Sequence, residues 1–395
     1  MEYAKIRSRL YQKIQEQLNF GRDYGDEEVR ELIDEVVLEA PESRPLPVKV
    51  RRLLRRELFD AIRRLDILQP FIEDNKVTEI MVNGPDTIFV EKDGALEQTD
   101  VKFESPEKLK DVIQKIVAGC NRVVNEASPI VDARLENGAR VNIVMDPVAL
   151  NGPVVTIRRF PDHPITMEQL VESGTLSGEA ADFLKRLVAA GYNLFVSGGT
   201  GSGKTTFLNA LSAYIPVCQR VITIEDSAEL QLQQIPNLVR LETRNRNEEG
   251  CREISIRELI RSSLRMRPDR IIIGEVRGAE TFDLMQCLNT GHDGSMSTGH
   301  ANSAEDMLFR LENMVLMGMD IPIAAIRQQI AAGLDVMIHL GRLRDGTRRV
   351  LKIVEIQACE EGKILLNTLY EYEDGSLLKK GEIIHDQKLK ASGVY

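Results

Sequence analysis

The sequence predicts a fold of the α/β class, in which a doubly wound domain follows N-terminal helices and a smaller α+β domain. Three observations predict it. After residue 166, short apolar runs alternate with helical segments, as buried parallel strands and their crossover helices do. Before residue 160, segments with a period of two residues are separated by turn signals. The 395 residues are 43% hydrophobic and 28% charged, which suffices for more than one core.

Residues 1–66 are expected to form an N-terminal helical region. Apolar residues recur every three or four positions from Tyr3 to Leu18, and again from Val29 to Val37. A proline-rich break then precedes a third amphipathic helix over residues 50–65. The outer face of this helix carries six arginines: Arg51, Arg52, Arg55, Arg56, Arg63 and Arg64. Such a face can bind nucleic acid or a membrane surface, but contact with water or with acidic neighbours is the favoured interpretation.

Residues 67–159 are expected to form the α+β domain. Period-two patterns predict strands at 78–82, 87–91, 130–135, 139–144 and 154–158. Ser105 followed by Pro106 indicates the start of a helix, because serine caps helix N-termini and proline fits the first turn. Two prolines in the segment from Phe160 to Pro164 predict an extended linker over residues 160–165.

Residues 166–395 are expected to form the doubly wound domain with a C-terminal extension. The alternation predicts helices at 177–190 and 205–214, and strands at 193–197, 220–224 and 270–273. Further strand pairs are predicted around the turns Asp345-Gly346 and Asp374-Gly375.

Charge and composition narrow the class of protein. The chain has 51 Lys and Arg against 61 Asp and Glu, a net charge of −10, whereas a nonspecific nucleic-acid binder needs positive charge. No run of 18 apolar residues predicts a transmembrane helix, and the first residues lack the apolar segment of a signal peptide. The five cysteines form no C-x-x-C pair, which favours reduced thiols over disulfides or zinc. We therefore expect a soluble, intracellular protein.

The strongest motif is a phosphate-binding loop that fits G-x-x-x-x-G-K-[ST] throughout. Its residues are Gly198, Gly199, Thr200, Gly201, Ser202, Gly203, Lys204 and Thr205, with Thr206 next in the following helix. Glycines let backbone N–H groups surround phosphate oxygens, and the helix presents its positive end to the anion. Lys204 is expected to reach the β- and γ-phosphates, and the Thr205 hydroxyl to bind Mg²⁺.

Three glutamates are candidates for handling the metal and the attacking water. Glu275 ends the apolar run 270–273, at the edge where open α/β sheets bind ligands. The usual aspartate is missing there, so we expect Glu275 to act through water, on Mg²⁺ or as the base. Glu225 and Glu229 follow the apolar run 220–224 and would help. The alternatives are a surface glutamate for Glu275 and a turn-capping cluster for the other two.

A polar, glycine-rich segment over residues 291–302 contains two of the five histidines, His292 and His300. It does not have the composition of an ordinary core strand or helix. Three interpretations stay open on the residues alone. The segment can sense a γ-phosphate through imidazoles and hydroxyls, it can be a plain loop, or it can bind a metal, although the spacing matches no standard ligand pattern.

Together these segments resemble the ATPases of type II secretion, type IV pili, conjugative secretion and Tad pili. Residues 198–205 match the Walker A motif of that superfamily. Ile224–Glu229 is similar to its Asp box, Ile273–Gly278 to its atypical Walker B, which lacks the aspartate, and Gly291–Ala301 to its His box.

Within that superfamily, the chain most resembles the CpaF-type ATPases of Flp/Tad pilus assembly. The segments that carry this likeness are Glu79–Gly84, Arg134–Asn142, Thr156–Phe160 and Leu264–Arg270. The sequence has no tetracysteine zinc motif, which many type II secretion ATPases contain. Gly299 stands where related motors more often have an aliphatic residue.

The resemblance implies a homo-hexamer whose subunits have a PAS-like N-terminal domain and a RecA-like C-terminal domain, with ATP and Mg²⁺ between them. It implies that His292 and His300 sense phosphate. It also implies that arginines of the N-terminal domain contact the phosphates, in the order Arg140, Arg158, Arg134 and Arg159. Arg277 would brace Glu275 or hold a subunit interface.

The implied work is pilin polymerisation or extrusion. It would take place at the inner face of the cytoplasmic membrane, with platform proteins as partners and no direct membrane or nucleic-acid contact. A conjugative secretion ATPase, a RecA-like DNA translocase and a nucleotide-gated scaffold with negligible turnover are the alternatives.

Overall fold

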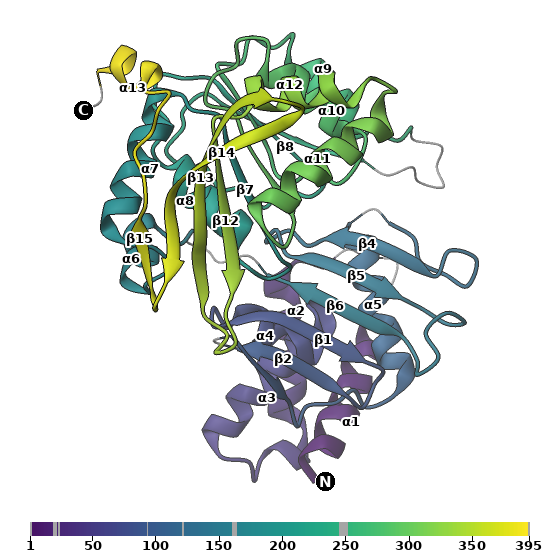
Figure 1. Cartoon of the computed structure of the whole chain (residues 1–395). Helices are drawn as coiled ribbons and strands as arrows, with labels where there is room; N and C mark the ends of the chain where they lie inside the picture. The colour runs from purple at the N-terminus through teal and green to yellow at the C-terminus, as the bar shows by residue number, and fades with distance from the viewer. Residues whose placement is uncertain are drawn as a thin grey trace. The chain divides into compact units, whose positions relative to one another are not determined.

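The computed structural model of the chain describes residues 2–18, 22, 24–92, 94–120, 122–159, 164–244 and 252–393. Most of the expected linker therefore lies outside the described residues. The chain divides into two compact units, Met1–Asp162 and His163–Tyr395 (Figure 1). No helix of the described part of the chain is both long and apolar enough to cross a bilayer.

Three amphipathic helices open the first unit: α1 (Glu2–Gln17), α2 (Asp26–Glu39) and α3 (Val48–Arg63). They share a core that includes the fully buried Leu10 and Leu54. Four of the six arginines of α3 and its C-cap lie within ion-pair distance of carboxylates: Arg55 of Asp34, Arg56 and Arg64 of Glu73, and Arg63 of Asp26. For these four, the interpretation as a face with acidic neighbours is confirmed.

The remainder of the first unit is a six-stranded antiparallel sheet in the order β3-β2-β1-β6-β5-β4. Its strands are β1 (Val77–Asn83), β2 (Ile88–Lys92), β3 (Ala95–Gln98), β4 (Ile130–Arg134), β5 (Arg140–Val144) and β6 (Val154–Arg158). The short turns η1 (Pro41–Ser43) and η2 (Asp66–Leu68) and helix α4 (Gln69–Glu73) precede the sheet. Helix α5 (Pro106–Gly119) packs its apolar face on the sheet, and its cap is confirmed, because the Ser105 hydroxyl accepts the Lys108 N–H.

The second unit is built on a nine-stranded sheet in the order β15-β14-β13-β12-β7-β11-β10-β8-β9. The six strands from β12 to β9 are mutually parallel, and β13 to β15 continue the sheet antiparallel. The bounds are β7 (Leu194–Gly198), β8 (Val221–Glu225), β9 (Leu238–Glu242), β10 (Arg270–Ile273), β11 (Met296–His300), β12 (Val336–Arg342), β13 (Arg348–Glu360), β14 (Lys363–Glu373) and β15 (Ser376–Lys379).

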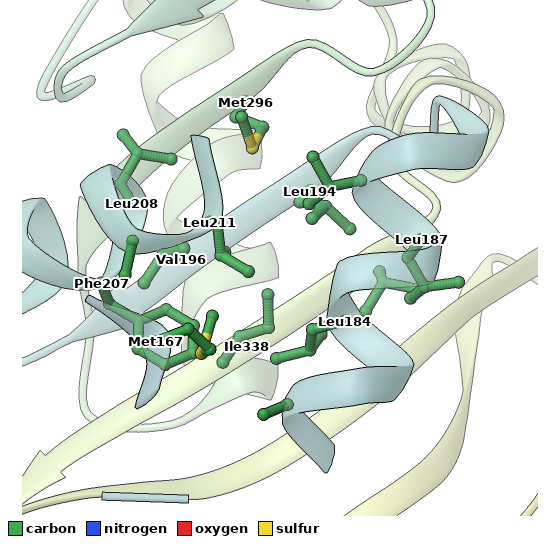
Figure 2. Packing of buried hydrophobic residues seen from close by; sticks show 14 of the residues in the cluster. Met167, Leu184, Leu187, Leu194, Val196, Phe207, Leu208, Leu211, Met296 and Ile338 are labelled. Atoms are coloured by element: carbon green, nitrogen blue, oxygen red, sulfur yellow. The ribbon is translucent and has the colours of Figure 1, made fainter. Parts of the chain in front are cut away.

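Helices cover both faces of this sheet, as the predicted doubly wound class requires. The helices are α6 (Met167–Glu172), α7 (Gly178–Ala190), α8 (Lys204–Ser212), α9 (Ile256–Ser263), α10 (Glu280–Leu288), α11 (Ala304–Gly318), α12 (Ile323–Gly333) and α13 (Gln387–Ser392). On β7, Leu194 and Val196 point into the core that α6, α7 and α8 cover (Figure 2), whereas Phe195 lies in the core under α9 to α12. The fold-class prediction is confirmed.

One sequence-based expectation about this sheet is wrong. The histidine-containing segment is not a loop throughout, because Met296–His300 forms β11, a buried strand in the middle of the sheet. Small residues are needed there: a Cβ on Gly299 would lie 2.9 Å from the methyl carbon of Met307 and 3.0 Å from the ring of Phe195. These two large side chains occupy the space that an aliphatic residue at position 299 would take.

Candidate phosphate-binding site

The phosphate loop connects the end of β7 to the start of α8, at the carboxyl edge of the parallel strands. Gly203 caps the helix with φ 91°, a left-handed conformation that favours glycine. Gly198 is needed for close packing, since a Cβ there would lie 2.4 Å from the Leu340 carbonyl oxygen. Thr205 sits half-buried in the first turn of α8, next to the N-terminal end of the helix. Backbone N–H groups and the helix dipole therefore converge on this loop.

The Lys204 side chain is buried against the loop that it serves. Its Nζ donates to the Gly199 carbonyl oxygen at 3.0 Å and lies 3.2 Å from Nδ1 of His300. Burial lowers the pKa of Lys204, with Glu275 acting in the opposite direction. A polyphosphate would offer this ammonium stronger acceptors than a carbonyl does.

His300 links Lys204 to Glu275. An ammonium group can only donate, so Nδ1 of His300 accepts and the ring proton is on Nε2. Nε2 lies 2.9 Å from Oε1 of Glu275. Burial lowers the pKa of His300, and although Glu275 opposes this shift, Lys204 and Arg277 add to it. The imidazole is therefore neutral near pH 7. It lies between Lys204, the first residue of α8, and Glu275, which follows β10.

Glu275 follows β10 at the same edge of the sheet. Its Oε2 accepts a hydrogen bond from Arg277 Nη2 at 2.7 Å. Its Oε1 is buried, and no donor of the described residues is aligned well enough to hydrogen-bond it. The nearest donor, Nε2 of His300 at 2.9 Å, is therefore not aligned with this buried oxygen, and a water molecule or a metal-bound water would satisfy it.

Arg277 lies among acidic groups. Its hydrogen bond to Glu275 is the largest cause of the raised pKa of Arg277, and the charges of Asp226 and Glu229 raise that pKa further. Beside it is a pocket of about 400 Å³, lined by Asp226, Arg277 and Glu280 among others. The phosphate loop does not line that pocket. Of the two roles expected for Arg277, the structure shows the contact with Glu275.

Glu225 ends β8 and is 3% exposed. Its Oε1 accepts the backbone N–H groups of Glu229 at 2.8 Å and Leu230 at 3.0 Å, so it holds the turn that follows the strand. Its Oε2 is buried and has no hydrogen-bond partner in the described part of the chain. Burial raises the pKa of Glu225 to about 7, although the two N–H groups oppose this shift. The Glu229 side chain itself is half-buried.

The position of Glu225 explains why no aspartate precedes Glu275. Gly274 pairs alongside the end of β8, and a Cβ on it would lie 2.9 Å from Cγ of Glu225. The glutamate of one strand thus fills the space where a side chain at position 274 would be. The glycine at position 274 and the glutamate at position 225 are therefore explained by the same contact.

The two histidines lie at opposite ends of strand β11: His292 precedes its first residue and His300 is its last. β11 runs parallel to β7, with His300 opposite Gly198 and Met296 opposite Leu194. His292 comes before Met296, and its Nδ1 lies 3.2 Å from the Cys287 carbonyl oxygen and 3.3 Å from the Thr290 hydroxyl. The structure therefore brings His300, but not His292, to the phosphate loop of this unit. The spacing of His292 and His300 in the sequence does not reveal this difference, because β11 lies between the two residues and carries the chain from one side of the sheet to the other.

Three of the four candidate arginines form a row across the first unit's sheet. Arg134 is opposite Arg140 on the neighbouring strand, and Arg140 is opposite Arg158. Residues directly opposite each other point to one face, and Val141 and Ile157 are buried on the other face. The three arginines therefore share one face of the sheet.

Arg159 does not belong to that row. Its guanidinium donates to the carbonyl oxygens of Asp74 and Val77 and to the Asn75 side chain. The expectation that Arg159 points to a phosphate has no support in its contacts, because these local oxygens occupy it.

Two further residues at the phosphate edge belong to none of the sequence motifs. His339, buried in β12, has its Nδ1 3.0 Å from Oγ of Ser197, the residue before the loop. Arg348, at the start of β13, donates from Nε to the Gly201 carbonyl oxygen at 3.0 Å. A histidine inside the apolar run 336–340 was a usable signal for the first. No sequence signal separated Arg348 from its neighbouring arginines.

The described residues include no cluster of three or more His, Cys, Asp and Glu side chains that could hold a metal alone. This arrangement still fits Mg²⁺ that arrives with a nucleotide, because that ion keeps several waters and uses phosphate oxygens as ligands. The Thr205 hydroxyl could be a direct ligand, and the unsatisfied oxygen of Glu275 could bind through water.

Comparisons with known proteins agree with this geometry. The family described as type II/IV secretion system protein matches residues 63–370. A Mycobacterium tuberculosis protein named for conjugal transfer is 33% identical over 341 residues, covering 85% of this chain and 95% of the relative. The type IV secretion system protein VirB11 of Brucella abortus is 34% identical over 313 residues, covering 72% and 86%.

Solved structures show the same fold. The pilus retraction motor PilT with bound ADP aligns with a TM-score of 0.53 and 20% identity, over 83% of this chain and 86% of that one. The ATPase DotB of Legionella pneumophila aligns with a TM-score of 0.52 and 19% identity, over 74% and 80%.

Proposed function

Because this chain belongs to the type II/IV secretion system family of ATPases, we propose that its ATP hydrolysis drives the assembly of Flp/Tad pili. Membership of this family implies that the chain hydrolyses ATP and supports a role as a secretion or pilus motor. The choice of the Flp/Tad machine rests on the four CpaF-like segments, Glu79–Gly84, Arg134–Asn142, Thr156–Phe160 and Leu264–Arg270. The single observation that carries the hydrolysis chemistry is the contact series from Lys204 through His300 to Glu275.

In the proposed mechanism, the phosphate loop and Lys204 hold the polyphosphate. The Thr205 hydroxyl would hold a Mg²⁺ ion that arrives with it, and that ion would supply positive charge to the phosphates. Glu275 positions the attacking water or accepts its proton, since its Oε1 has no competing donor of good geometry among the described residues. When Lys204 turns to the phosphates, His300 loses its partner at Nδ1, which can then accept from a new donor, or donate to a phosphate oxygen once it has taken up a proton. His300 is therefore the phosphate sensor.

The arginine row of β4, β5 and β6 is proposed to supply cations to the transferring phosphate, with Arg140 and Arg158 ahead of Arg134. Arginine is suited to this role because its planar group donates two parallel hydrogen bonds to phosphate oxygens. We further propose a homo-hexameric ring. It would work at the inner face of the cytoplasmic membrane through platform proteins, with no nucleic-acid partner.

The sensor assignment is tested with a matched pair of histidine variants. His300→Gln should lower phosphate release on the order of a hundredfold, as the loss of a positioned polar group at a reacting phosphate does. His292→Gln should stay near the wild-type rate, because this residue lies at the other edge of the sheet. Equal loss in both variants would contradict the assignment.

The assignment to a machine is tested by adding candidate platform proteins. The rate of ATP hydrolysis should rise when the purified chain is mixed with the Flp/Tad platform proteins encoded in the same genome. In cells, replacing the chain with its Glu275→Gln variant should abolish surface pili. The similarity to a protein named for conjugal transfer and to the type IV secretion system protein VirB11 favours a second candidate, a conjugative secretion motor. That candidate would gain support if DNA transfer, and not piliation, depended on the same residue.

A further inference from the structure

A second cationic side chain contacts the phosphate loop from a part of the fold that no motif includes. Arg348 opens β13, directly after the turn that leaves β12. Its Nε donates to the Gly201 carbonyl oxygen at 3.0 Å. Its Cδ lies 3.3 Å from the place where a Cβ on Gly203 would be, so its aliphatic stem packs against the loop.

This contact fixes one peptide plane of the loop. In a trans peptide the carbonyl and the next N–H point in opposite directions. With the Gly201 carbonyl held outward by Arg348, the N–H of Ser202 points to the inside of the loop. Its partner within the described part of the chain is the Gly199 carbonyl oxygen, at a long 3.4 Å. A phosphate oxygen would be a stronger acceptor for that N–H group.

The rest of the guanidinium remains available. Arg348 is an exposed side chain, and no carboxylate in the described parts of the chain lies within ion-pair distance of it. Its neighbour Arg349 differs, because it donates to the Ser173 carbonyl oxygen at 2.8 Å and lies over Gly174. A guanidinium whose two terminal nitrogens have no partner among the described residues, and which lies beside a phosphate loop, is suited to a second anion contact.

We propose that Arg348 is a positioning residue of the nucleotide site: it keeps the peptide between Gly201 and Ser202 oriented for phosphate and adds positive charge beside the bound polyphosphate. The proposal concerns nucleotide binding by this ATPase and holds whichever secretion or pilus machine it serves. The β12–β13 hairpin thereby becomes part of the nucleotide site.

The test compares Arg348→Ala with Arg344→Ala, an exposed arginine of the same turn that does not contact the loop. Titration with a fluorescent ADP analogue, and displacement of that analogue by pyrophosphate, measure binding of the phosphates. Arg348→Ala should raise both the Kd and the KM for ATP about tenfold, which is the usual effect of losing one charged hydrogen bond. Its kcat at saturating ATP should change much less.

Arg348→Lys distinguishes positioning from a general loss of structure. Its ammonium can still donate to the Gly201 carbonyl oxygen, so it should recover part of the affinity, and nucleotide-free melting temperatures should match the wild type. Unchanged affinity in Arg348→Ala would overturn the proposal, and so would an equal loss in Arg344→Ala. Should alanine impair folding, Arg348→Met, which keeps an aliphatic stem but cannot donate a hydrogen bond, repeats the measurement, and wild-type affinity there would also refute the proposal. Because the isolated chain is used, the result is independent of the pilus assignment.

Discussion

Glu225→Gln should remove a pH dependence from the stability of the second unit. Burial raises the pKa of Glu225 to about 7 in the folded chain, against an ordinary value of 4.5. The unfolded chain thus releases this proton near pH 4.5 and the folded chain only near 7. The stabilisation from this group is complete below pH 4.5, and it is lost as the pH rises through 7.

The size of the effect follows from those two values. A difference of about 2.5 pH units, at about 1.4 kcal/mol each, gives about 3 kcal/mol between pH 5 and 8. For a unit of this size, that corresponds to roughly 6 to 12 °C in Tm. Glutamine keeps an oxygen for the N–H groups of Glu229 and Leu230 and carries no charge. Its buried amide nitrogen costs the same free energy at every pH, so only the slope with pH reports the titration.

Differential scanning calorimetry of the nucleotide-free chain from pH 5 to pH 8 is the assay. The Tm of the variant relative to the wild type should rise steadily over this range, and at pH 5 the variant should not be the more stable protein. If the difference in Tm between the two proteins is the same at pH 5 and pH 8, the argument that Glu225 is buried with a raised pKa is refuted.

Four other substitutions have definite expectations. Glu275→Gln should keep ATP binding but lose phosphate release in a single-turnover assay, and undiminished turnover would reject its role as base or water-positioning group. Lys204→Ala should abolish measurable nucleotide affinity in a titration, because it removes the buried cation of the loop; wild-type binding would reject the phosphate-loop assignment. Gly274→Ala should lower the Tm, since its Cβ would lie 2.9 Å from Glu225, with a cost of about 1 to 3 kcal/mol; an unchanged Tm would show that Glu225 moves freely. Arg158→Ala should lower kcat far more than it raises the Kd for ATP, and an unchanged kcat would remove it from the reaction.

Residues of the site that end parallel strands could be predicted from the sequence. Lys204, Glu225 and Glu275 each follow an apolar run, and such runs in a doubly wound sheet end at one edge. The contact between Lys204 and His300 could not be predicted, because it depends on β11 lying between β7 and β10. A motif gives the order of residues along the chain but not the order of strands across the sheet.

The missed elements share a physical cause. All four residues of β3 are exposed, so no apolar alternation indicated a strand. β11 is buried but built from small and polar residues, which resemble a loop in composition. Arg348 contacts Gly201 across 147 positions of sequence, and only the pairing of β12 with β7 brings them together. Each miss comes from tertiary context that local sequence does not record.

β11 has a consequence for how the site could signal. It is hydrogen-bonded on one side to β7, which bears the phosphate loop, and on the other to β10, which bears Glu275. The strand ends that carry the phosphate loop, Glu275 and His300 therefore lie side by side in one sheet, and these strands cannot slide past one another without breaking their pairing. We expect the state of the nucleotide to be transmitted first by side chains at these strand ends that exchange hydrogen-bond partners. In such a design, the time needed to respond is set by rotamer changes and proton positions, and the large movements of a motor begin elsewhere in the molecule.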